Sequence, residues 1–286
     1  MENKLTPKPS WLRKKITPTV DKNMKELLEK AGANTVCQEA MCPNISECFK
    51  HNQATFLIMG TICTRKCTFC AVSKGKPIPL DSNEPENIAK AVKQLGLKYV
   101  VITSSTRDDL CDGGAEHFCK TVSAIKSIDN SIDVELLIPD MKENKEALEK
   151  VMKSGATIIG HNLETVPRLY NIRKGASYER SLRVLNILSS FGSLASIKSG
   201  IMLGLGEKDD EVITLMEDLI GVGCSYLSIG QYLSPSSKHT KVIEYVDPKK
   251  FEYFKDIGEK MGFKYIKSSP YTRSSYMAHE YLEGGD

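Results

Sequence analysis

Two hydrophobic periods alternate along most of this chain. Short apolar runs typical of strands recur at six places, and longer segments with apolar residues at helical spacing separate them. The predicted strands are 54–60, 98–104, 132–138, 156–160, 197–205 and 226–233. The predicted helices are 84–95, 114–127, 142–153, 178–191, 209–221 and 248–260. Strand, helix and strand at this spacing indicate parallel strands joined by right-handed crossovers.

The number of units predicts the architecture. A closed barrel of this kind has eight strands, so six units indicate an α/β fold with an open, partial (β/α)6 TIM-like barrel. We place the barrel at 54–262, an N-terminal extension at 1–53 and a C-terminal extension at 263–286. In the N-terminal extension, a proline- and lysine-rich arm precedes a short helix that Asp21 is expected to cap.

Composition narrows the class of protein. The chain has 286 residues, 41% of them hydrophobic, and a formal net charge of only +3, which gives no reason to expect nucleic acid as a partner. No apolar run approaches the roughly 20 residues of a membrane helix, and no signal peptide is evident. We therefore expect a cytoplasmic protein without a membrane partner. Because structural disulfides are rare in the cytoplasm, the cysteines point to metal binding or catalysis.

The cysteines are concentrated in one segment, since six of the nine lie between positions 37 and 70. Cys63, Cys67 and Cys70 follow the first predicted strand, at the mouth where barrels hold their active sites. A structural zinc site needs four ligands, and a [4Fe–4S] cluster normally takes four thiolates. Three cysteines therefore leave either an open iron on a cluster or a zinc site that lacks a ligand.

This Cys-x-x-x-Cys-x-x-Cys spacing resembles the signature of the radical S-adenosylmethionine (SAM) superfamily, with an aromatic residue, Phe69, before the third cysteine. The resemblance implies that SAM binds the open iron and is cleaved to a 5′-deoxyadenosyl radical. Arg65 and Lys66 place positive charge beside the anionic cluster.

A second triplet, Cys37, Cys42 and Cys48, lies upstream in "CQEAMCPNISEC". It too has no evident fourth ligand nearby in the sequence, although a ligand role for His51 stays open. Two open triplets indicate two clusters. One of them either relays electrons or supplies sulfide as a reagent.

The chain also resembles the lipoyl synthase family. The resemblance starts at the two cysteine motifs and runs from about Trp11 to Tyr276. It continues through "GKPIPLDSNEP", "RDDLCDGGA", "HNLETVPRLYNIRKGASY", "KSGIMLGLGE", "GQYLSPSSKHTKVIEYVDPKKF" and "RSSY". In that family the upstream triplet, here Cys37, Cys42 and Cys48, holds an auxiliary [4Fe–4S] cluster whose fourth ligand is a serine of the last motif. Ser275 is the expected ligand here, and Ser274 is the alternative.

The resemblance implies a substrate and a reaction. The substrate is an octanoyl group on a lysine of a lipoyl carrier domain, either from a dehydrogenase E2 subunit or from the glycine-cleavage carrier protein. Sulfur from the auxiliary cluster enters at C6 and C8. Flavodoxin or ferredoxin is the expected electron donor, and an iron–sulfur carrier protein is a further expected partner.

SAM contacts are expected at the ends of two strands. By resemblance to related radical enzymes, Asn162 and Glu164 bind the ribose hydroxyls, and Arg173 pairs with the SAM carboxylate. Thr103 and Ser104 end the second strand and contact SAM through hydroxyl or backbone. The alternatives are purely structural roles. Glu164 would then be a carboxylate at the start of a helix, and Arg173 would form an ion pair on the surface.

Some motif residues have two interpretations. The glycines of "GIMLGLGE" either let the backbone approach the adenine or serve a tight turn. The acidic loop with Asp108, Asp109 and Asp112 either orders the site, receives the carrier or caps a helix. We expect no ligand role for the remaining cysteines or for four further histidines, which are Cys111, Cys119, Cys224, His117, His161, His239 and His279.

Two other classes of protein stay as alternatives. Another two-cluster radical enzyme, such as a biotin-synthase-like or methylthio-transferring one, would share the barrel and the motif of Cys63, Cys67 and Cys70. It is not expected to carry both the upstream motif "CQEAMCPNISEC" and "RSSY". A ferredoxin-like carrier or a metal-stabilised binding module would not need six βα units.

Overall fold

A curved parallel sheet organises the structure, a computed structural model that describes residues 8–13, 18–51 and 53–283. Its seven strands lie in the order β1-β4-β5-β6-β7-β8-β9. They are β1 (Thr55–Ile58), β4 (Tyr99–Ser104), β5 (Asp133–Leu137), β6 (Ile158–Gly160), β7 (Ser196–Leu203), β8 (Tyr226–Gln231) and β9 (Tyr265–Ser268). Every neighbouring pair is parallel, so all the carboxyl ends meet at one edge, the mouth of the barrel.

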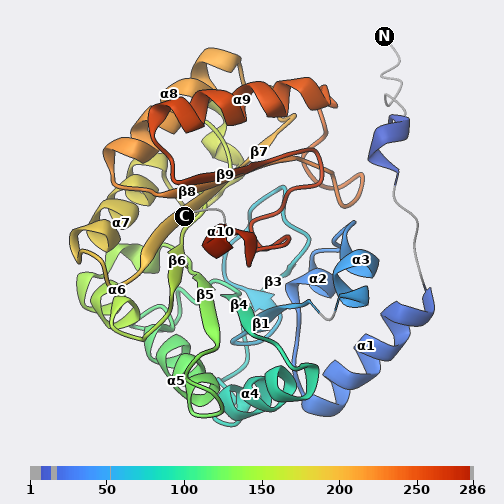
Figure 1. The fold of residues 1–286 in the computed structure, drawn as a ribbon, viewed down its shortest axis with the longest axis vertical. Helices are drawn as coiled ribbons and strands as arrows, with labels where there is room; N and C mark the ends of the chain where they lie inside the picture. Colours follow the sequence, from blue (N-terminus) through green and yellow to red (C-terminus); the bar gives the residue numbers. More distant parts are fainter. Residues whose placement is uncertain (1–7, 14–17, 52, 284–286) are drawn as a thin grey trace.

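Helices cover the outside of this sheet, as Figure 1 shows. They are α4 (Glu84–Leu95), α5 (Ala115–Lys126), α6 (Lys145–Met152), α7 (Tyr178–Ser190), α8 (Asp209–Gly221) and α9 (Pro248–Met261). Each of the six predicted strands and six predicted helices is present. The predicted fold class, an α/β partial barrel, is therefore confirmed.

The seventh strand, β9, was not predicted. It pairs with β8 from Tyr226↔Tyr265 to Ile229↔Ser268, so the sheet continues past the boundary that we placed at residue 262. β9 is only four residues long, and its third residue, Lys267, is polar. Such a short, mixed segment carries almost no periodic signal, so only its pairing with β8 identifies it.

Residues with suitable side chains or backbone freedom set the ends of two of the helices. The Ser177 hydroxyl accepts a hydrogen bond from the Arg180 amide at 3.1 Å and starts α7. Asp247 caps α9 ahead of Pro248, and Gly262 ends that helix with φ +102°, a conformation that favours glycine.

Side chains on the strands alternate between two environments. In β4, Val100 and Ile102 face outward into the main core beneath the helices, whereas Val101 faces the barrel interior. The interior face of β5 and β7 carries Glu135 and Lys198, both at most 1% exposed. The barrel interior is therefore partly polar, unlike the apolar layer outside the sheet.

The C-terminal tail, residues 269–283, occupies this interior. Figure 1 shows α10 (Glu280–Glu283) in the middle of the ring of strands. Tyr281 is fully buried against Val101, Ile158 and Tyr226. Lys198 Nζ lies 3.6 Å from the centre of the Tyr281 ring and donates to the Ser274 carbonyl at 2.6 Å. The same ammonium pairs with Glu135 at 2.8 Å, so one buried cation holds the tail to two strands.

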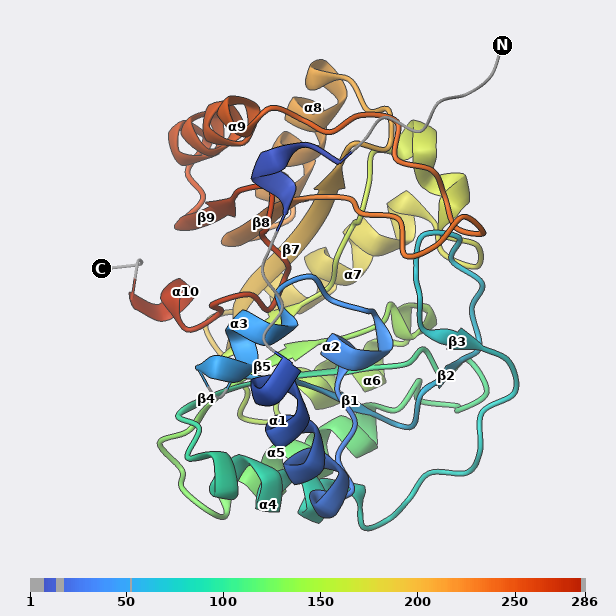
Figure 2. The ribbon, with the colours of Figure 1, turned by 90° about the vertical axis from the view of Figure 1, so that its right-hand side faces the viewer.

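The N-terminal extension covers the edge of the sheet that β1 forms. It contains α1 (Pro18–Ala31), α2 (Val36–Glu39) and α3 (Ile45–Lys50). Since α1 begins at Pro18, Asp21 lies inside the helix and the predicted cap there is wrong. Thr35 forms an antiparallel bridge with Phe56, and the Leu57 amide donates to the Asn34 carbonyl at 2.9 Å. These contacts hold α2 alongside β1, while α3 packs against α1 (Figure 2).

None of the helices in the described ranges has the length and apolarity that crossing a bilayer requires.

We predict that Gly230→Ala dislodges the tail. A Cβ atom at Gly230 would lie 2.0 Å from the Thr272 carbonyl oxygen, which is backbone and cannot rotate away. The expected cost is about 1–3 kcal/mol of unfolding free energy, with faster proteolysis of the tail. Gly221→Ala is the matched control, because a Cβ there meets nothing within 4 Å. Equal stability and equal tail cleavage in both variants would contradict the prediction.

Candidate active site

The loop that carries Cys63, Cys67 and Cys70 follows β1 at the mouth of the barrel, as expected. A short ribbon of β2 (Ile62–Cys63) and β3 (Ser73–Lys74) closes this loop. Its middle is also held, because the Thr68 amide donates to the Ile172 carbonyl at 2.8 Å and the Thr68 carbonyl accepts from the Thr240 amide at 2.9 Å. Backbone from after β6 and after β8 thus positions the three thiols.

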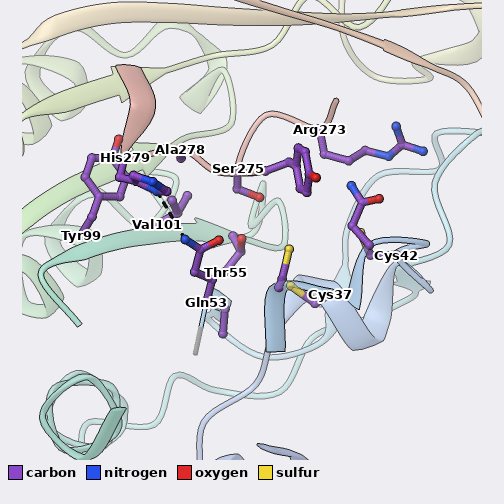
Figure 3. A pocket seen from close by; sticks show the side chains of 14 residues that line it. Cys37, Cys42, Gln53, Thr55, Tyr99, Val101, Arg273, Ser275, Ala278 and His279 are labelled. Atoms are coloured by element: carbon purple, nitrogen blue, oxygen red, sulfur yellow. Dashed lines mark hydrogen bonds between the residues drawn. The ribbon is translucent and has the colours of Figure 1, made fainter. Parts of the chain in front are cut away.

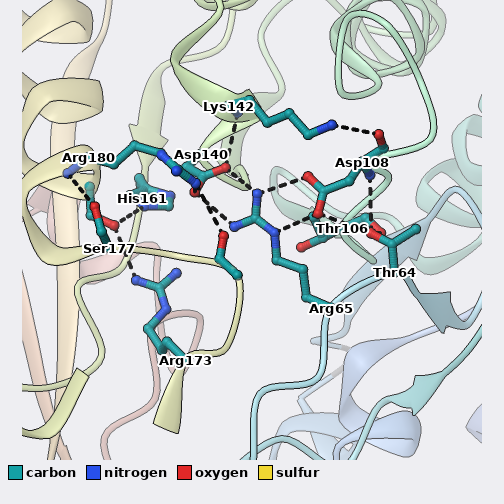
Figure 4. Close-up of polar contacts among 12 residues, drawn as sticks. Thr64, Arg65, Thr106, Asp108, Asp140, Lys142, His161, Arg173, Ser177 and Arg180 are labelled. Atoms are coloured by element: carbon teal, nitrogen blue, oxygen red, sulfur yellow. Dashed lines mark hydrogen bonds and ion pairs between the residues drawn. The ribbon is translucent and has the colours of Figure 1, made fainter. Parts of the chain in front are cut away.

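Arg65 anchors the same loop from within. Its guanidinium bonds Asp108 at 2.8 and 2.9 Å, and Asp140 at 2.8 and 2.6 Å (Figure 4). Burial disfavours the charged guanidinium, but the two carboxylates outweigh it and raise the pKa of Arg65. Arg65 lies near enough to Cys67 for its positive charge to favour that thiolate, as expected, while Asp108 and Asp140 hold the guanidinium in place. Lys66 is exposed.

The acidic loop after β4 is thereby explained. Asp108 holds Arg65, and Asp109 pairs with Arg107 at 2.8 Å. Asp112 accepts from the amides of Gly114 and Glu116, both at 2.9 Å, at the start of α5. The loop therefore both orders the cysteine loop and caps a helix.

Two of the thiols are partly enclosed by protein. Burial raises the pKa of Cys70 to about 11 and that of Cys67 above its usual value. Arg173 and Glu164 are the charged groups that act most on Cys67, so the segment after β6 lies beside the cysteine loop.

The segment after β6 brings Asn162, Glu164 and Arg173 together. Asn162 Nδ2 donates to Glu164 Oε1 at 3.2 Å, and Arg173 Nη1 donates to the Asn162 carbonyl at 2.8 Å. Glu164 has φ +69°, a strained conformation that its backbone bonds to Gly200 and Met202, both at 2.9 Å, maintain. Burial raises the pKa of the Glu164 carboxyl.

Arg173 is not in a surface ion pair among the described residues. It is half-buried, and Nη1 donates to the Tyr170 hydroxyl as well as to the Asn162 carbonyl. The guanidinium also lies over the Tyr170 ring, at 5.3 Å.

Two hydroxyl side chains, Thr103 and Ser104, end β4. Thr103 Oγ1 donates to the Leu137 carbonyl at 2.9 Å and is satisfied within the sheet. Ser104 Oγ is buried and has no hydrogen-bond partner among the described residues. A buried hydroxyl without a partner is costly, so Ser104 is suited to contact a bound molecule.

A pocket beside the N-terminal helices contains all of Cys37, Cys42, Cys48 and Ser275 (Figure 3). Cys37 comes from α2 and Cys48 from α3, whereas Ser275 comes from the tail. Burial raises the pKa of Cys37 to about 11. Arg273, which also lines the pocket, lies near enough to Cys42 for the two to interact electrostatically.

Three hydrogen bonds between the ends of the chain build this pocket. Asn44 Nδ2 donates to the Tyr271 carbonyl at 2.7 Å, and the Tyr276 hydroxyl donates to Glu47 at 3.0 Å. Gln53 Nε2 and His279 Nδ1 are 3.3 Å apart. The pairs are separated by more than 220 residues in the chain, so no local pattern could predict them.

The two consecutive serines of the tail point in different directions. Ser275 lines the cysteine pocket, whereas the Ser274 hydroxyl accepts from Asn162 Nδ2 at 2.8 Å. The geometry therefore favours Ser275 over Ser274 as a partner of the three cysteines. His51 is exposed and is not among the residues that line the pocket.

The other candidates have structural surroundings. Cys111 is exposed, Cys119 is half-buried beside α6, and Cys224 is fully buried with a pKa raised to about 12 by burial. His279 lines the cysteine pocket and pairs with Gln53, and three further histidines also bond protein groups. These are His117 with Glu84, His161 with Ile138 and Ser181, and His239 with Ser236.

The glycines of "GIMLGLGE" serve packing and a turn. Gly204 has φ +100°, and a Cβ there would lie 2.2 Å from Gln231 Nε2. Glu207 then accepts hydrogen bonds from the amides of Gly204 and Leu205.

Sequence reasoning missed Asp140, Glu135 and Lys198. Asp140 follows β5 at the mouth, and Glu135 and Lys198 interrupt otherwise apolar strands. A charge inside an apolar strand is the signal that could have marked the last two, because such groups are buried only when paired.

Comparison with known proteins decides the family. Residues 57–219 match the model of the radical SAM superfamily. The chain is 54% identical over 276 residues to the lipoyl synthase of Geobacter sp. (strain M21), covering 96% of this chain and 95% of the relative. It is 55% identical over 274 residues to the lipoyl synthase of Geobacter metallireducens, with coverages of 96% and 97%. This chain belongs to the lipoyl synthase family.

The fold agrees with that membership. The crystal structure of methylornithine synthase superposes with a TM-score of 0.59 at 15% identity, over 89% of this chain and 72% of that one. Streptococcus suis SuiB bound to S-adenosylmethionine superposes with a TM-score of 0.55 at 16% identity, over 76% and 50%. As a member of the lipoyl synthase family, the chain is a radical SAM sulfurtransferase.

Membership implies SAM and a [4Fe–4S] cluster, and the residues present fit both. A single metal ion needs closely converging ligands, and no three Cys, His, Asp or Glu side chains in the described ranges converge in that way. A cluster spreads its thiolates over several irons instead. The thiols at the mouth suit such a cluster, and the charged groups of Glu164 and Arg173 near Cys67 suit a polar cofactor beside it.

We predict that Arg65→Met destabilises the enzyme by about 3 kcal/mol. The substitution leaves Asp140, which is 0% exposed, as a poorly compensated buried charge. Lys66→Met is the matched control, since it removes the same charge one residue away from an exposed position. Urea unfolding measures both variants. Equal losses of unfolding free energy in the two variants would show that the clamp, meaning the ion pairs of Arg65 with Asp108 and Asp140, does not stabilise the loop.

Proposed function

We propose that this enzyme inserts sulfur at C6 and C8 of an octanoyl group carried on a lysine of a lipoyl carrier domain. The observation that carries the proposal is the pocket that Cys37, Cys42 and Cys48 line together with Ser275. A cluster used only for electron transfer would not need an oxygen ligand brought from the far end of the chain.

In this proposal, three sets of residues have separate roles. Cys63, Cys67 and Cys70 hold the cluster that binds SAM. Cys37, Cys42, Cys48 and Ser275 hold a second, auxiliary [4Fe–4S] cluster. Thr103, Ser104, Asn162, Glu164 and Arg173 contact SAM.

When bound, the first cluster and SAM supply a 5′-deoxyadenosyl radical, and the auxiliary cluster supplies the sulfur. The protein contributes binding and orientation. Burial raises the pKa of Cys37 and of Cys70 to about 11, so these thiols deprotonate only beside the positive charge of iron. The Ser275 hydroxyl is a harder donor than a thiolate and hence a ligand that is readily exchanged. Arg273 offsets negative charge near Cys42.

Glu164 and Asn162 are positioned to accept hydrogen bonds from the hydroxyl groups of the SAM ribose. The hydrogen bond between the two side chains keeps them at a fixed distance from each other. Arg173 is fixed through Nη1, which leaves the rest of its guanidinium to face the SAM carboxylate. In this proposal, each of the three parts of the chain contributes one set of these residues. Residues 1–53 bring the auxiliary cysteines, 54–262 build the radical site, and 263–286 bring the serine ligand.

The mouth also has a basic surface. Six exposed lysines lie on the loops that follow β1, β6 and β8, which contact one another at Thr68. They are Lys66, Lys74, Lys76, Lys174, Lys238 and Lys241. None of the six pairs with a carboxylate of the described residues, whereas Lys98, Lys150 and Lys250 have partners at 2.8, 2.9 and 2.7 Å. This surface supports docking of an octanoylated carrier domain through an acidic face.

The remaining partners belong to the same proposal. The carrier is a dehydrogenase E2 lipoyl domain or the glycine-cleavage carrier protein. Flavodoxin or ferredoxin donates electrons, and an iron–sulfur carrier protein restores the auxiliary cluster.

Anaerobic turnover with SAM, dithionite and an octanoylated lipoyl domain tests the reaction. We expect the intact mass of the domain to show two added sulfur atoms. Cys63→Ala should abolish both SAM cleavage and sulfur insertion, whereas Cys48→Ala should abolish insertion and keep SAM cleavage. Cys111→Ala, at an exposed position, is the matched control and should retain both. SAM cleavage by the wild type without sulfur gain would exclude the proposed reaction.

Charge reversal on the mouth tests the carrier surface. We expect the Lys238→Glu/Lys241→Glu double variant to raise KM for the carrier domain about tenfold at low salt, with kcat unchanged, because charge complementarity steers encounter. Lys260→Glu/Lys264→Glu is the control, since both lysines lie at the opposite edge of the sheet. Dithionite removes the electron-donor protein from the assay, so an unchanged KM would refute carrier docking here.

A further inference from the structure

The two adjacent serines of the tail serve two different sites. Ser275 faces the auxiliary cysteines, and Ser274 faces the strands that carry the proposed SAM contacts. Ser274 Oγ is 2.8 Å from Asn162 Nδ2 and 3.4 Å from Ser228 Oγ. The tail is therefore a direct physical connection between the two proposed cofactor sites.

Space for this contact exists because position 200 is glycine. A Cβ atom there would lie 2.8 Å from both Ser274 Oγ and Asn162 Oδ1, and 2.5 Å from Ser228 Oγ. Any other residue would push Ser274 and Asn162 apart. Since Gly200 lies within β7 and does not need positive φ, this close approach is the physical reason for a glycine here.

The contact sets the orientation of the Asn162 amide. Nδ2 has two hydrogens, and these go to Ser274 Oγ at 2.8 Å and to Glu164 Oε1 at 3.2 Å. The Oδ1 atom accepts no hydrogen bond from a side chain or amide of the described residues and is left as an acceptor. Ser274 thus holds Asn162 in the amide orientation that presents an acceptor alongside the Glu164 carboxylate.

Ser274 is itself held firmly. Its carbonyl oxygen accepts from Lys198 Nζ at 2.6 Å, and Lys198 is paired with Glu135 at 2.8 Å. Both charged side chains are at most 2% exposed. The position of Ser274 is therefore set by the sheet, and the hydroxyl is delivered to Asn162 without the help of a ligand.

We propose that Ser274 is a positioning residue for SAM, acting through Asn162, and that it couples SAM binding to the segment that carries Ser275. The inference rests on the proposed function, in which Asn162 and Glu164 contact SAM. Because Ser274 and Ser275 are consecutive, ordering Asn162 against SAM restrains Ser275, and restraint of Ser275 favours SAM binding by the same factor.

Equilibrium SAM binding to the cluster-loaded enzyme tests the first part. Ser274→Ala should weaken SAM binding about tenfold, the loss expected for one hydrogen bond to a buried amide. KM for SAM should rise by the same factor, with the maximal rate of SAM cleavage unchanged. Ser228→Ala is the matched control, because it removes the neighbouring hydroxyl 3.4 Å from Ser274, and it should stay within twofold of wild type.

Ser275→Ala gives the opposite pattern. It should lower the iron content of the auxiliary site and leave SAM affinity within threefold of wild type. Loss of auxiliary iron in Ser274→Ala, or equal loss of SAM affinity in both variants, would mean that the two serines do not divide the work as proposed.

A double-mutant cycle separates positioning from general damage. In the Asn162→Ala background, Ser274→Ala should have no further effect on SAM affinity, since its only route to SAM is removed. Independent, multiplying losses would overturn the proposal, even if each single variant binds SAM weakly.

Amide hydrogen exchange on the wild type tests the coupling without any variant. SAM should slow exchange in the peptide spanning residues 272–276, and this protection should be absent in Ser274→Ala. Unchanged exchange in the wild type, with SAM shown to be bound, would refute the coupling. Failure of the proposed function is distinguishable, because it appears as a wild type that binds SAM yet adds no sulfur to the octanoyl domain.

Discussion

The buried ion pair between Lys198 and Glu135 is the interaction on which the rest of the site depends. It lies inside the barrel, where two charges are tolerated only when they are fully paired. Lys198 also donates a hydrogen bond to the Ser274 carbonyl and lies over the ring of Tyr281. One ammonium therefore satisfies a carboxylate, a peptide group and an aromatic ring, and so it fixes the C-terminal tail inside the sheet.

Placing the tail there completes a site that neither end of the chain can form alone. The N-terminal helices bring three thiols to the edge strand β1, and the tail brings Ser275 across from β9. Asn44 and Tyr271 then join the two ends directly. Since these contacts join the two ends of the chain, the pocket requires both ends to be in place.

The loop that carries Cys63, Cys67 and Cys70 is supported by a different interaction. Cys67 and Cys70 lie on irregular backbone between β2 and β3, which has conformational freedom unless side chains fix it. Arg65 removes that freedom by bonding two carboxylates from the mouths of neighbouring strands, Asp108 and Asp140. The loop is thus positioned before any cofactor binds. Catalytic geometry held by a rigid scaffold is the general solution for barrels.

The sequence by itself determined the six βα units of the barrel and indicated iron–sulfur chemistry. Periodicity is local, so the six strands and helices of the barrel followed from it, and the cysteine spacing indicated clusters. Tertiary structure alone decided β9, the Arg65 clamp and the division between Ser274 and Ser275. The reason is physical. Each of these depends on a partner tens to hundreds of residues away, and on side-chain directions that only the packed tail defines.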